Sequence, residues 1–148
     1  MPERGSTFQH RNLPLLLLQA RECVISRFRP LLNAAGITEQ QWRIVRVLLE
    51  LGPLEPRQIV RLCGISSPSL AGVLSRMEAL GFVTRKKVDH DARRLKVSPT
   101  ATSRALARRI AAQIEAAYAE IETTVGTEFT ARLYDALDQL IARLGTPA

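Results

Sequence analysis

The basic residues of this chain are concentrated in one segment. Nine arginines and lysines and two aspartates lie between Phe82 and Ile110, so this segment carries a charge of +7, which equals the net charge of all 148 residues. A cationic segment of this kind is typical of a surface that binds a polyanion such as duplex DNA. A solvated basic surface is the alternative, but the concentration of charge in one segment favours a binding surface.

A second group of residues has the types and spacing needed to read DNA bases. Residues 55–81 have helix-turn-helix spacing: a short helix leads through Gly64 into a second, capped helix. Small and hydroxyl side chains on the outer face of the second helix would let it lie deep in the major groove. The predicted buried face consists of Leu70, Val73, Leu74, Met77 and Leu80. The predicted DNA-binding residues are Ser66, which should also cap the helix, Ser67, Ser69, Gly72, Ser75 and Arg76.

Two short strands, 82–85 and 95–98, are predicted to form a hairpin around a polar turn at 88–94. Asp91 precedes Arg93 by two residues, and at a tight turn its carboxylate can brace that guanidinium for entry into the minor groove. A charged loop with self-compensating ion pairs is the alternative, which the excess of positive charge disfavours. The hairpin residues predicted to contact DNA are Lys86, Lys87, Arg93, Arg94 and Lys96.

Catalytic and metal-binding patterns are missing from the sequence. The two histidines, His10 and His90, fall in a polar tail and a turn, and Cys23 and Cys63 are too few for a disulfide scaffold or a zinc site. The protein is therefore predicted to be neither an enzyme nor a cofactor-binding or metal-binding protein. The apolar run 13–18 is far too short to span a membrane, and no signal peptide is recognisable, so a cytoplasmic location is expected.

Hydrophobic periodicity predicts a mainly α winged helix-turn-helix fold in the order α-α-α-α-β-β-α-α. A DNA-binding module at 38–98 lies between outer helices at 13–34 and 100–144, and residues 1–12 form a loose tail. The apolar stripes of the outer helices exceed what the small module can cover, which favours a homodimer. The predicted helices are 13–34, kinked at Pro30, 38–51, 56–63, 66–80, 100–125 and 127–144.

Three stretches together resemble the MarR family of winged-helix repressors: Gln58–Ser66, Arg76–Val83 and Asp91–Arg93. The resemblance runs from Leu13 to Leu144. It implies an obligate dimer whose wings straddle a pseudo-palindromic operator, and Asp91 with Arg93 matches the family's wing motif. After the second strand the family usually has Leu-Thr-x-x-Gly, but residues 99–103 lack that leucine and glycine. This departure puts the local bend, but not the fold, in question.

Residues 17–22, 28–32 and 38–46 are further similar to regulators of homoprotocatechuate-degradation operons. That resemblance implies repression of an aromatic-acid catabolic operon, released by a phenolic acid such as a hydroxyphenylacetate. In the family, small aromatic acids bind between the dimer helices and the DNA-binding module.

Three residues are candidates for effector binding. Arg21 lies on the apolar stripe of the first helix, where a charge needs an anionic partner: a ligand carboxylate or, alternatively, a salt bridge within or between subunits. Trp42 offers a flat wall for an aromatic ring, or simply belongs to the core. Arg43 aligns with Arg46 and Glu50 on a polar face, where solvent exposure is expected, and the resemblance keeps it a candidate.

Two rival functions remain at this point. Some relatives carry a peroxide-sensing cysteine in the first helix, where Cys23 lies here, but the tyrosines that accompany it are missing, since the only tyrosines are Tyr118 and Tyr134. Arg21 and Arg27 are the only cations that lie near Cys23 in the sequence. A winged helix that binds a protein is the other rival, and its recognition face should be apolar or acidic, not rich in serine.

Overall fold

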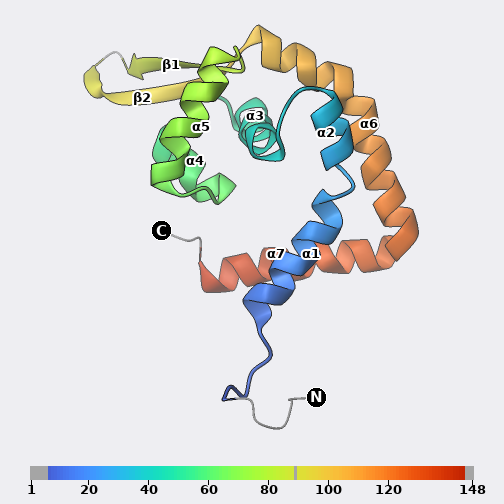
Figure 1. Cartoon of the computed structure of the whole chain (residues 1–148). Coiled ribbons are helices and arrows are strands. Elements are labelled where there is room, and N and C mark those ends of the chain that lie inside the picture. Colours follow the sequence, from blue (N-terminus) through green and yellow to red (C-terminus); the bar gives the residue numbers. More distant parts are fainter. Residues whose placement is uncertain (1–6, 89, 146–148) are drawn as a thin grey trace.

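The computed structural model describes residues 7–88 and 90–145, without the side chains of Ala92 and Arg93. It has the predicted mainly helical architecture, with a hairpin between the fifth and sixth helices (Figure 1). The elements are α1 (Leu13–Ile25), α2 (Arg29–Ala34), α3 (Glu39–Leu51), α4 (Pro56–Cys63), α5 (Ser67–Ala79), β1 (Val83–Val88), β2 (Asp91–Pro99), α6 (Ala101–Val125) and α7 (Thr127–Leu144).

The first predicted helix is two helices, so the expectation of a single helix kinked at Pro30 was wrong. The chain turns at residues 26–28, and Pro30 lies in the first turn of α2. Proline lacks the N–H that a continuous helix needs and its ring would collide with the carbonyl four residues earlier, so it is better tolerated in a first turn. Both terminal nitrogens of Arg29 donate to the Glu22 carboxylate across the break, at 2.9 and 2.8 Å.

The helix-turn-helix module forms around α3, α4 and α5. The capping box predicted at the start of α3 is present, since Thr38 and Gln41 exchange backbone and side-chain hydrogen bonds of 3.1 Å. Leu80 was wrongly predicted to be buried and is 56% exposed, because the chain reverses at Gly81 and Phe82 turns into the core instead. The buried core of the module includes Ile44, Val45, Leu48, Ile59, Leu70, Val73, Leu74, Met77, Val83 and Val97.

The hairpin, which we call the wing, is longer than predicted. β1 and β2 pair antiparallel, with Lys86 opposite Lys96, and the ladder continues to Val88 and Asp91. Most of the predicted turn is therefore strand. The added residues, 86–88 and 91–94, are mostly charged and lack the alternation of apolar and polar residues that marks a half-buried strand, whereas residues 95–98 show it. Leu54 and Val97 exchange backbone hydrogen bonds of 3.0 and 2.7 Å, which attach β2 to the α3–α4 loop.

Helices α1 and α7 lie away from the wing, at the opposite end of the molecule (Figure 1). Neither helix contains a buried residue, although both are rich in large apolar side chains. Among the residues that the structure describes, no helix combines the length and apolar character needed to cross a membrane. The exposed apolar residues are Leu13, Leu15, Leu17, Leu18 and Val24 of α1 and Phe129, Leu133, Tyr134, Leu137, Ile141 and Leu144 of α7.

Candidate nucleic-acid interface and pocket

The outer face of α5 presents small polar groups to solvent. Ser66 occupies the N-cap position, but its hydroxyl bonds to the Ser69 hydroxyl at 2.8 Å and makes no capping bond to the helix backbone. The turn before it depends on Gly64, whose φ of +63° is the left-handed conformation that glycine adopts without strain. All six residues predicted to read DNA in this helix are exposed: Ser66, Ser67, Ser69, Gly72, Ser75 and Arg76.

The basic residues of the wing divide into two groups. Arg85 is half-buried and donates to Glu78 of α5, with N–O distances of 3.0 and 3.3 Å. This hydrogen bond lowers the pKa of Glu78 below its usual value. Arg94 pairs with Glu55, the residue before α4. Within the described part of the chain, no ion pair engages the exposed side chains of Lys86, Lys87 and Lys96.

The predicted brace between Asp91 and Arg93 lies outside what the structure describes, because the Arg93 side chain is not described. Asp91 itself begins β2 and its side chain is exposed. This pair therefore stays a prediction from the sequence.

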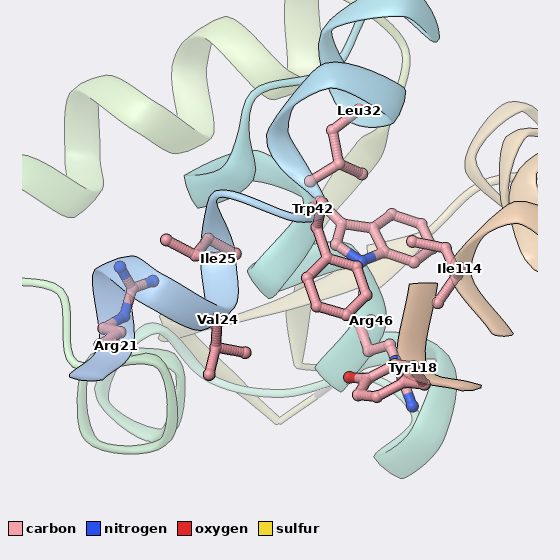
Figure 2. Close-up of a pocket in the computed structure, with 9 residues that line it drawn as sticks. Arg21, Val24, Ile25, Leu32, Trp42, Arg46, Ile114 and Tyr118 are labelled. Carbon is pink, nitrogen blue, oxygen red and sulfur yellow. The ribbon is translucent and has the colours of Figure 1, made fainter. Parts of the chain in front are cut away.

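A pocket of about 240 Å³ lies between α1, α2, α3 and α6 (Figure 2). Its walls are apolar and aromatic, and two arginines supply its only charges. The Phe28 and Tyr118 rings pack with their centroids 4.8 Å apart and their planes at 58°. The Arg46 guanidinium lies 5.9 Å from the Tyr118 ring centroid, within cation–π range. The lining residues are Arg21, Val24, Ile25, Phe28, Leu32, Trp42, Arg46, Ile114 and Tyr118.

The chain that carries this serine-rich helix and basic hairpin is similar to known regulators over most of its length. A model of the MarR family matches residues 35–94. The homoprotocatechuate degradative operon repressor of Escherichia coli is 42% identical over 133 residues, which cover 90% of each chain. The chain belongs to the MarR family. As the sequence predicted, it is a DNA-binding transcription regulator and not an enzyme.

Two further similar proteins extend the comparison. The transcriptional regulator FarR of Neisseria gonorrhoeae is 39% identical over 132 residues, covering 89% of this chain and 90% of FarR. The crystal structure of NadR in complex with 4-hydroxyphenylacetate is similar with a TM-score of 0.79 and 38% identity, covering 95% of this chain and 97% of that one. The predicted winged helix-turn-helix fold is therefore confirmed over nearly the whole length of this MarR-family chain.

The effector candidates from the sequence lie in different surroundings. Arg21 lines the pocket, and its Nη2 also donates to Glu39 at 2.6 Å. Trp42 lines the pocket and is half-buried. Arg43 does not line the pocket, and the expectation that it is solvent-exposed was wrong. Its side chain is 29% exposed and bonds to Glu39 and to the Cys63 carbonyl.

Arg46 lines the pocket, although the sequence predicted it on the polar face of its helix and it was not a candidate for effector binding. It follows Trp42 by four residues, so both side chains lie on one face of α3. The four-residue spacing from Trp42 could have indicated that Arg46 faces the pocket, but its charge favoured the interpretation that it faces solvent. Its Nε donates to Glu50 at 2.7 Å, and this hydrogen bond raises the pKa of Arg46 above its usual value despite partial burial.

The two cysteines differ in environment. Cys23 is exposed on α1, whereas Cys63 is buried at the end of α4, and burial raises the pKa of the Cys63 thiol. Among the described residues no group of three histidine, cysteine or acidic side chains could hold a metal ion. Redox sensing at Cys23 stays an untested alternative.

Proposed function

We propose that this protein is a homodimeric repressor of an aromatic-acid catabolic operon and that a small phenolic acid releases it from a pseudo-palindromic operator. The observation that carries the proposal is the pocket between α1, α2, α3 and α6, which combines aromatic walls with two arginines. Two relatives support it: the E. coli repressor is named for homoprotocatechuate degradation, and NadR was solved with 4-hydroxyphenylacetate.

The chemistry of the pocket suits one aromatic ring with a short acidic arm. Trp42, Phe28 and Tyr118 offer ring surfaces for stacking, and Leu32 and Ile114 complete an apolar lining. Pockets for drug-sized ligands are typically about 300–1,000 Å³. A cavity of about 240 Å³ is below that range and favours a single-ring ligand.

Two arginines are candidates to hold the carboxylate. Arg46 lies with Trp42 and Tyr118, whereas Arg21 lies apart from this group at the α1 end of the pocket (Figure 2). Glu50 accepts a hydrogen bond from Arg46 Nε. The terminal N–H groups of the planar guanidinium can donate to a ligand carboxylate. We therefore assign the anchoring role to Arg46 and retain Arg21, the candidate from the sequence, as a second cation that attracts the same anion.

The DNA-binding part of the proposal uses α5 and the wing. The exposed serines, Gly72 and Arg76 would contact base edges and phosphates in the major groove. Lys86, Lys87, Lys96 and Arg93 would follow the neighbouring backbone and minor groove. The exposed apolar stripes of α1 and α7 would pair with those of a second copy, which places two α5 helices on half-sites about 34–36 Å apart.

Release requires that the effector prefers one spacing of the two α5 helices. A ligand shifts this equilibrium only by its difference in affinity for the DNA-competent and DNA-incompetent arrangements. A coupling of about 1–3 kcal/mol gives a measurable response. The protein would act beside the chromosome, in the cytoplasm.

Two measurements test this function. The purified protein is titrated calorimetrically with 4-hydroxyphenylacetate and related acids, with 4-hydroxyphenylacetamide as the uncharged control. Operator DNA is selected from a random duplex pool, and its affinity is measured with and without each acid. We expect the acid to bind, the amide to bind far more weakly, and only the acid to weaken the DNA complex. Failure of every aromatic acid to bind contradicts the effector proposal, and salt-independent binding to generic duplex contradicts DNA binding.

A further inference from the structure

A single carboxylate connects the pocket to the helix-turn-helix. Glu39, the first residue of α3, accepts a hydrogen bond from Arg21 Nη2 at 2.6 Å and two from Arg43, from Nε at 3.1 Å and Nη2 at 2.8 Å. The remaining terminal nitrogen of Arg43 donates to the carbonyl oxygen of Cys63. A continuous series of hydrogen bonds therefore runs from α1 at the pocket, through α3, to the last residue of α4.

The Glu39 side chain is only 16% exposed, as little as that of Glu55 at 15% and much less than that of Glu22 at 47%. Burial acts to raise its pKa, but the hydrogen bonds and charges of Arg43 and Arg21 prevail and lower it. The group is therefore an anion held between two cations. In such a partly buried cluster the loss of one partner changes the interaction of the carboxylate with the other.

At the end away from the pocket, the series of hydrogen bonds reaches Cys63, which lies next to the turn between α4 and α5. Cys63 ends α4, and its carbonyl is one of those that a helix leaves without an intrahelical partner. Gly64 follows in the left-handed conformation, and α5 begins three residues later. The Cys63 thiol also lies 3.9 Å from the Arg43 carbonyl oxygen, so α3 and α4 contact each other twice at this point.

We propose that Glu39 is the positioning residue through which the effector pocket acts on the DNA-reading helix. An anion in the pocket attracts Arg21, which lines it, away from Glu39. Glu39 then interacts differently with Arg43, and Arg43 holds the turn before α5. The two arrangements, with Arg21 on Glu39 or on the effector, are the alternatives whose balance the effector shifts. This inference rests on the proposed effector function, and by linkage DNA binding must alter effector affinity by the same factor.

The first test measures coupling with 4-hydroxyphenylacetate as the probe. Glu39→Gln keeps the shape of the side chain and removes its charge. We expect the variant to bind the operator and the probe. The ratio of its operator affinities without and with saturating probe should fall from at least about fivefold in the unaltered protein to nearly one. Glu120→Gln is the matched control, because Glu120 also pairs with an arginine, Arg27, and neither residue lines the pocket or belongs to the series. That control should keep the full ratio.

The second test needs no effector. If Glu39 connects Arg21 to Arg43, the effects of Arg21→Ala and Arg43→Ala on operator affinity should be non-additive by about twofold or more. The same pair of substitutions should become additive in the Glu39→Gln background. Additive effects in the unaltered background, or a full effector response in Glu39→Gln, would overturn the inference. An unaltered protein that binds no aromatic acid counts against the proposed effector, and the mutant cycle still decides whether Glu39 positions α5.

Discussion

Arg94 of the wing and Glu55, the residue before α4, are joined by an ion pair in which Nε and Nη2 of the arginine both donate to Oε1 of the carboxylate, Nε at 2.7 Å. Beside this pair, Leu54 and Val97 exchange backbone hydrogen bonds. The wing is therefore attached at two neighbouring points beside the start of α4, in addition to the Arg85–Glu78 pair that joins it to α5. The sequence predicted that Arg94 contacts DNA, and its engagement with Glu55 leads us to expect that it orients the wing.

The salt dependence of DNA binding should separate these two roles. Arg94→Ala is expected to weaken operator binding while leaving the slope of log affinity against log salt unchanged, because no phosphate contact is lost. Lys86→Ala, which removes an exposed wing cation, should reduce that slope by about one phosphate's worth. Fluorescence anisotropy across a salt series provides both values. Glu55→Gln should match Arg94→Ala, and a slope lowered equally by Arg94→Ala and Lys86→Ala would identify Arg94 as a DNA contact.

Gly72 offers a test in which stability and DNA binding change in opposite directions. It lies within α5, and a methyl group there would meet only Arg76 Nη1 at 3.7 Å, an ordinary contact. Gly72→Ala should raise the free energy of unfolding by about 0.5–1 kcal/mol, because glycine is a poor residue inside a helix. If this face approaches DNA closely, operator affinity should fall. Urea denaturation and anisotropy measure the two quantities, and a stabilised variant with unchanged affinity would show that Gly72 does not face the DNA.

The carboxylate anchor can be assigned by substituting the two pocket arginines separately. Arg46→Ala should lower the affinity for 4-hydroxyphenylacetate by at least about tenfold, since a charge-assisted hydrogen bond contributes about 1.5–3 kcal/mol. Arg46→Lys should recover little, because lysine lacks the planar guanidinium. Arg21→Ala should have a smaller effect. Calorimetry gives these affinities. A larger loss of affinity in Arg21→Ala than in Arg46→Ala would show that Arg21 is the carboxylate anchor.

The helix-turn-helix could be predicted from the sequence, because capping residues and helical periodicity are local signals. The sequence also singled out Trp42, which lines the pocket. It did not distinguish Arg43 from Arg46. Helix α3 packs against the pocket on one side and against α4 on the other, so both arginines are partly enclosed by elements distant in sequence. The pairing of Arg94 with Glu55 likewise joins residues 39 positions apart, which no local pattern predicts.

The charge on Glu39 should make stability depend on pH in the acid range. Its folded pKa lies below the ordinary value of 4.5, so ionised Glu39 stabilises the fold above that pH. This contribution is lost as the pH falls through the folded pKa. The unaltered protein should therefore exceed Glu39→Gln in free energy of unfolding at neutral pH, and this difference should shrink as the pH falls below 4.5 and through the lowered pKa of Glu39. Urea denaturation at a fixed protein concentration tests this, and a difference that is constant with pH would contradict it.

The apolar stripe of α7 predicts that the isolated subunit is not stable. Phe129, Leu133, Leu137 and Ile141 recur at helical spacing and remain exposed, as do the leucines of α1. Deleting residues 127–148 should therefore cause aggregation or unfolding, because it removes the α7 part of the surface that we expect a second copy to cover and obligate dimers often lack a stable monomer.

A milder variant keeps this prediction testable if the truncated chain cannot be purified. Leu137→Asp places a charge at the middle of the stripe and should convert the dimer to a less stable monomer in analytical ultracentrifugation. Asp138→Ala, an exposed neighbour outside the stripe, is the control and should remain dimeric. A truncated chain that stays folded and monomeric, or a Leu137→Asp variant that sediments as a dimer, would show that α7 does not form the interface.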